Sequence, residues 1–71
     1  MKIKKGNTLV LEFKQPMPGL FQNGVATVEK LNADGVHFLV NFKRSPNSPQ
    51  GHSLILSTKD FGKQYVIQSV Y

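Results

Sequence analysis

The stretch 24–44, GVATVEKLNADGVHFLVNFKR, limits the possible folds of this chain more than any other, because it predicts a β-hairpin. Apolar and polar residues alternate on both sides of a turn at 32–35. A period of two is typical of strands that bury one face. Gly35 ends the turn, where glycine adopts a positive φ at little steric cost.

Two closures of this hairpin compete, and they differ by one residue in register. A two-residue loop would place Val28 opposite Asn41, whereas a three-residue loop with Gly35 as the left-handed bulge residue places it opposite Val40. We predict the second closure because it keeps the apolar residues of both strands on one face. The predicted pairs are Asn32 with Val36, Lys30 with Phe38, Val28 with Val40 and Ala26 with Phe42.

Three more strands are predicted outside the hairpin. An alternating strand ends at Phe13, a short apolar strand covers 53–57 and a final strand covers 64–71. The connection at 57–63 has room for one 3₁₀ turn. β-branched and aromatic residues dominate every apolar run and no window has a helical period, so the predicted class is all-β.

The spacing of these strands resembles the connectivity of SH3-like small barrels. A long first loop is followed by a three-strand meander and then by a short connection to the final strand. The resemblance extends over the whole chain as a pattern of lengths, and it implies one small five-stranded barrel domain over 1–71. The alternative is an OB-type barrel, against which stands the lack of a helical segment between the third and fourth strands.

The charge of the chain indicates the class of its partner. Nine Lys and Arg against four Asp and Glu give a formal net charge of +5. A basic domain of this size is typical of proteins that bind a polyanion, most often nucleic acid. The chain has no cysteine and no apolar run of the roughly 20 residues that a membrane span needs, so we expect a cytoplasmic protein.

Basic and aromatic side chains near two connections form the predicted nucleic-acid site. The proline-rich loop at 43–53 opens with the only adjacent Lys-Arg pair, and the connection at 57–63 mixes lysines with aromatics. Lysine and arginine would neutralise phosphates, and aromatic rings would stack on unpaired bases. The candidates are Lys43, Arg44, Lys59 and Lys63 for phosphates, with Phe61 or Tyr65 for stacking.

A second hypothesis is a small protein-interaction module or inhibitor of the phage- or plasmid-type modulator kind. It would bind a larger protein through the apolar residues Met17, Leu20 and Phe21 of the first long loop, or through an edge strand. The same three residues could instead fold back as a lid over the core. A terminal strand at a free sheet edge would also allow a homo-oligomer.

Catalysis, cofactors and metal ions are not expected. The acidic residues and histidines are Glu12, Glu29, Asp34, Asp60, His37 and His52. Two of the acids are explained by turns, and the histidines lack metal-ligand spacing. A small barrel also has little volume for a cleft, so we expect a binding protein and not an enzyme.

Overall fold

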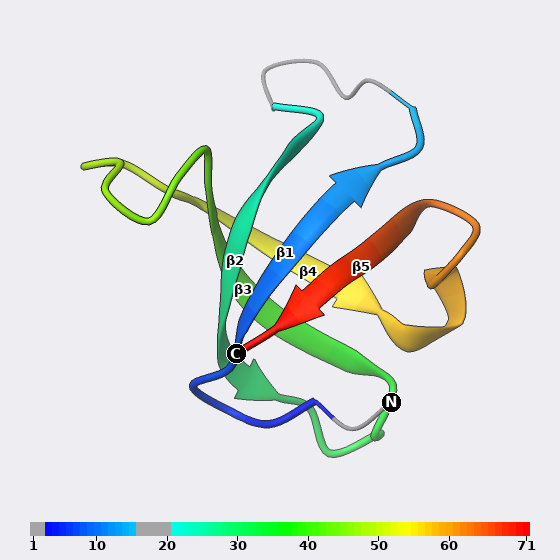
Figure 1. The fold of residues 1–71 in the computed structure, drawn as a ribbon. Coiled ribbons are helices and arrows are strands. Elements are labelled where there is room, and N and C mark those ends of the chain that lie inside the picture. Colours follow the sequence, from blue (N-terminus) through cyan, green and yellow to red (C-terminus); the bar gives the residue numbers. More distant parts are fainter. Residues whose placement is uncertain (1–2, 16–20) are drawn as a thin grey trace.

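Five antiparallel strands form one sheet in the computed structural model, which describes residues 3–15 and 21–71 (Figure 1). The elements are β1 (Thr8–Phe13), β2 (Asn23–Leu31), β3 (His37–Lys43), β4 (His52–Ser57), the 3₁₀ turn η1 (Thr58–Asp60) and β5 (Tyr65–Val70). The predicted all-β class and the 3₁₀ turn are confirmed. In the described ranges, no helix is long and apolar enough to cross a membrane.

The core lies on the inner face of the curved sheet and includes the inner face predicted for the hairpin. Aromatic rings connect its parts through edge-to-face contacts. The ring centroids of Phe13 and Phe42 lie 5.3 Å apart, and those of Phe13 and Tyr65 lie 6.4 Å apart. The buried apolar side chains are Leu9, Leu11, Phe13, Ala26, Val28, Phe38, Val40, Phe42, Leu56 and Tyr65.

The hairpin register agrees with the prediction at its open end and differs toward the turn. Val28 lies opposite Val40, as predicted. The register then shifts at Glu29, so Leu31 lies opposite Phe38, one residue later in β2 than predicted. A bulge of this kind inserts one unpaired residue without moving the paired residues before it to the other face.

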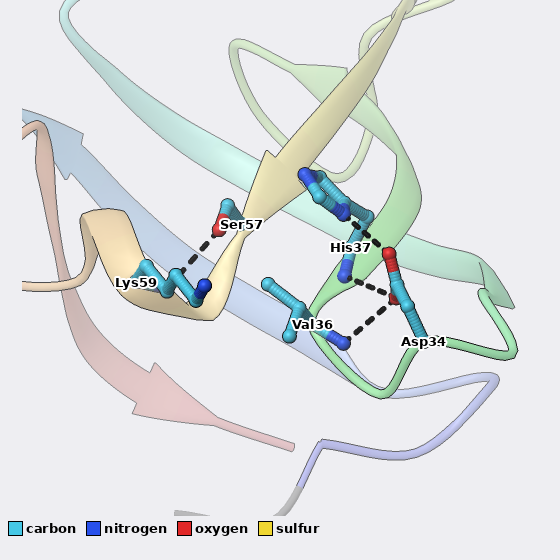
Figure 2. A network of polar contacts seen from close by, with 5 residues as sticks. All are labelled: Asp34, Val36, His37, Ser57 and Lys59. Carbon is cyan, nitrogen blue, oxygen red and sulfur yellow. Dashed lines mark hydrogen bonds and ion pairs between the residues drawn. The ribbon is translucent and has the colours of Figure 1, made fainter.

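The turn is longer than predicted because a side chain caps it (Figure 2). The Asp34 Oδ1 atom accepts hydrogen bonds from the backbone N–H groups of Val36 (2.8 Å) and His37 (3.0 Å), and Oδ2 lies 2.6 Å from Nδ1 of His37. The loop is therefore 33–36 in place of three residues. Gly35 has φ +71°, which confirms its predicted conformation.

β4 and β5 lie at the two ends of the strand order β4-β3-β2-β1-β5. No backbone pairing joins them in the described part of the chain, so the sheet is not closed and a closed barrel is not confirmed. Side-chain and turn contacts link them instead. The Tyr65 hydroxyl donates to the Ser57 carbonyl (2.8 Å), and Gly62 N–H donates to the Tyr65 carbonyl (2.8 Å). The Ser57 hydroxyl caps η1 by accepting from Lys59 N–H (3.1 Å; Figure 2).

Tyr65→Phe tests the link between β4 and β5. The variant keeps the buried ring but leaves the Ser57 carbonyl without its donor, so we expect a loss of about 1–2 kcal/mol in the free energy of unfolding. Urea denaturation measures this loss. Tyr71→Phe is the matched control, because Tyr71 is 75% exposed. Equal effects of the two substitutions would contradict the assigned role of the Tyr65 hydroxyl.

Asp34→Asn tests the capped turn through its pH dependence. Hydrogen bonds from His37 and Val36 lower the pKa of Asp34 well below its ordinary value. The charged carboxylate therefore stabilises the fold above the unfolded-state pKa of about 4, and this contribution is lost as the pH falls through the lower folded-state pKa. In urea denaturation, the stability difference between the wild type and Asp34→Asn should shrink from about pH 7 to about pH 2. A constant difference would show that the carboxylate charge has no such role.

Candidate nucleic-acid interface

The predicted phosphate-binding residues fall into two groups at opposite ends of β4. Lys43 and Arg44 lead into the loop before β4, whereas Lys59 and Lys63 follow its end. Six residues of strand at about 3.3 Å each separate the groups by about 20 Å. Figure 1 shows the loop before β4 and η1 on opposite sides of the molecule. The predicted residues therefore do not form one continuous site.

In the first group, Arg44 lies against an aromatic ring from another loop. Its guanidinium carbon is 5.3 Å from the centroid of the Phe21 ring, within the range of a cation–π contact. Next to Phe21, the Gln22 carbonyl accepts a hydrogen bond from the N–H of Phe13 (2.7 Å), which ties this segment to the end of β1. Both Arg44 and Phe21 remain exposed, so a ligand can reach the pair.

Two shallow hollows flank Arg44. One lies toward β1 and β2 and includes Gly24 in its wall. The other is formed largely by the loop before β4, and its polar side chains offer hydrogen-bond donors and acceptors beside the guanidinium. This second hollow is lined by Phe21, Arg44, Ser48, Pro49, Gln50 and His52. The arrangement combines a cation, a stacking ring and polar groups, which is the chemistry that recognises a nucleotide.

The loop before β4 contains a hydrogen-bonded turn, although its composition predicts only an extended, mobile loop. Ser48 N–H donates to the Ser45 carbonyl (3.1 Å), and Ser45 N–H donates to the Ser48 hydroxyl (3.2 Å). These reciprocal bonds hold one wall of the polar hollow. The signal for this turn was present in the sequence, because serine side chains commonly bond to nearby backbone groups.

Gly24 allows the backbone to approach Arg44 closely. A Cβ atom at this position would overlap the carbonyl oxygen of Lys43 and crowd the ring of Phe42. The start of β2 can therefore lie against the end of β3 only because residue 24 has no side chain. This close approach determines where the chain leaves β3 and, with it, the position of Arg44.

The second group surrounds a hollow of different chemistry. Phe61 is 45% exposed and lines an apolar hollow with Ile3, Thr58, Tyr65 and Ile67. Of the two predicted stacking candidates, Tyr65 is the buried one: it is 1% exposed and packs between other aromatic side chains. Burial also raises the pKa of Tyr65 above its ordinary value. Phe61 is thus the exposed aromatic at this end of β4.

The residues of the alternative protein-partner site are only partly described. Met17 and Leu20 lie outside the described residues, so both the lid and the partner-site hypotheses for this loop stay predictions. Phe21, the third member, lies under Arg44 and is 43% exposed. Sequence reasoning placed this residue in the partner loop and did not link it to Arg44, because the two belong to loops distant in the sequence.

The ionisable groups that could serve catalysis or metal binding are dispersed. Within residues 3–15 and 21–71, no three His, Asp or Glu side chains gather where they could hold a metal ion. In the described part of the chain, the one acidic side chain that contacts a histidine is Asp34, whose partner His37 belongs to the same hairpin. His52 lies at the other end of β3–β4, beside Arg44.

Comparison with known proteins adds no functional assignment. No family model matches the chain, and neither the curated proteins nor the solved structures contain a significant match. The interface is therefore interpreted from its own geometry and charge.

Gly24→Ala tests the close approach that positions Arg44. The added methyl group would press on a backbone carbonyl, which cannot rotate away, so we expect a loss of about 1–3 kcal/mol in unfolding free energy. Gly51→Ala is the matched control, since its nearest neighbours are the side-chain atoms of Asn41 and Lys43, which can move. Urea denaturation compares the two variants. A larger loss for Gly51→Ala would contradict the proposed role of Gly24.

Proposed function

We propose that this chain is a non-catalytic nucleic-acid-binding protein that contacts a single strand of DNA or RNA at Arg44 and Phe21. The observation that carries the proposal is the exposed guanidinium over the Phe21 ring, 5.3 Å from its centroid and beside a polar hollow. The net charge of +5 supports the same partner class. Such a protein would act as an accessory or regulatory factor in the cytoplasm.

Each part of the interface has a distinct task in this proposal. Arg44 and the neighbouring Lys43 neutralise phosphates, and release of the displaced counterions makes binding depend on salt. The planar guanidinium also presents a face on which a base can stack. Phe21 adds a second stacking surface, and the polar side chains of Ser48 and Gln50 accept or donate hydrogen bonds at base edges.

A single strand fits this interface better than a duplex does. In a duplex, the faces of the bases are covered by their neighbours, so an aromatic ring finds no base to stack on. An exposed aromatic and arginine pair gains its full contact only with unpaired bases. The strand order and connection lengths further support a small SH3-like barrel as the scaffold, with an OB-type barrel as the alternative.

The apolar hollow beside Phe61 favours a second candidate function. Its walls include Ile3, Tyr65 and Ile67, and such a lining suits an apolar side chain of a protein partner better than a phosphate. The chain would then be a small interaction module or inhibitor that contacts a larger protein at this end of β4. The two candidate functions use different ends of the strand, so they can be separated by substitution.

Fluorescence anisotropy with a labelled single-stranded oligonucleotide tests the proposed function. The double variant Phe21→Ala with Arg44→Ala should weaken binding about tenfold or more, because one stacking surface and one phosphate contact are lost. The matched control is Phe61→Ala with Lys59→Ala, which also removes one aromatic and one cation but at the other end of β4. This control should bind as the wild type does.

Salt and strand type complete the test. Wild-type affinity should fall as salt rises, and a duplex of the same length should bind more weakly than the single strand. Absence of salt-dependent binding at micromolar protein would reject the nucleic-acid function. Equal losses in both double variants would reject the assignment of the interface to Arg44 and Phe21.

A further inference from the structure

Both edge strands of the sheet lack charged residues and proline. The sequences of β4, HSLILS, and β5, YVIQSV, are each six residues long. Each of the three inner strands contains at least one charged residue, as at Glu12 in β1, Lys30 in β2 and Lys43 in β3. Proteins usually place charge or proline on edge strands, because a bare edge pairs with strands of other chains. The distribution here is the reverse.

Each edge also presents backbone groups that point away from the sheet. The Ser57 carbonyl on β4 accepts a bond from outside the β3–β4 ladder, and the Tyr65 carbonyl on β5 accepts one from outside the β1–β5 ladder. In an antiparallel ladder every second residue points the same way. The next outward groups are therefore those of Ile55 on β4 and Ile67 on β5, and nothing in the described part of the chain pairs with them.

Apolar side chains accompany these open edges. Ile55 on β4 is 67% exposed, and Val70 on β5 is 40% exposed. Of the features that usually protect an edge strand, β4 and β5 contain only a bulge, at Gln68 of β5. Ile67 precedes this bulge, and its outward backbone groups remain unpaired. Each edge thus offers backbone hydrogen bonds and apolar contacts to an incoming strand.

We propose that β4 of one copy of this chain pairs with β5 of another copy, and that repetition of this contact closes a ring larger than a dimer. Pairing of two β4 strands, or of two β5 strands, would leave the other edge bare in each copy. Head-to-tail pairing of β4 with β5 covers both edges of every copy with a single kind of contact. Such a contact builds a ring if the rotation that relates successive copies brings the last copy back to the first.

The charge distribution argues for a second copy as the occupant. Each copy carries a net charge of +5, so two copies repel each other over most approaches. The uncharged β4 and β5 edges are where two such molecules can meet without placing like charges opposite each other. Both strands are six residues long, so the free outward groups of one can lie along those of the other.

Sedimentation velocity and light scattering on the full chain test this proposal. The wild type should form one discrete species larger than a dimer. Ile55→Lys should dissociate it to monomers, because a lysine on the edge opposes strand addition and the replaced side chain is already exposed. Ser53→Lys, at the second outward position of β4, should act in the same way if Ile55→Lys affects folding.

Thr27→Lys is the matched control. It adds the same charge to an exposed position of β2, which has strands on both sides, so the assembly should persist. Circular dichroism verifies that each variant is folded. The proposal is overturned if the wild type is a monomer or dimer at every protein concentration, if it forms open fibres, or if folded Ile55→Lys and Ser53→Lys keep the assembly.

Discussion

The burial of Tyr65 is the contact on which the two ends of this sheet depend. β4 and β5 share no backbone ladder, yet the Tyr65 ring packs on Phe13 from β1, and its hydroxyl bonds the last carbonyl of β4. A ring in this position fills the inner space that an open five-stranded sheet would otherwise leave to water. Because this contact holds the start of β5 next to the end of β4, the short connection through η1 can join the two strands.

The hairpin shows how far a hydrophobic pattern determines a register. The pairing of Val28 with Val40 followed from the sequence because a slip there would expose a whole apolar row. Beyond Glu29 both strands approach the solvent-exposed turn, and little apolar area depends on the register. Hydrogen bonds from the Asp34 carboxylate decide the loop length there, and such local polar bonds leave no trace in apolar periodicity.

The candidate interface was less predictable than the fold. Composition and charge identified Arg44, but its contact with Phe21 joins two loops, and no periodicity encodes a contact between loops. The choice between Phe61 and Tyr65 as the stacking ring was left open by the sequence for a related reason. In a domain this small, most large aromatics are needed to fill the core, and sequence alternation alone does not tell which one is left outside.

The different environments of the two tyrosines give the chain a built-in optical reporter. Tyr65 is buried with a bonded hydroxyl, Tyr71 is 75% exposed, and the sequence contains no tryptophan. Tyr71 already lies mostly in water in the folded state, so the change in tyrosine absorbance and emission on unfolding arises mainly from Tyr65. Tyrosine spectroscopy of the unmodified protein therefore follows the junction between β4 and β5 without an introduced label.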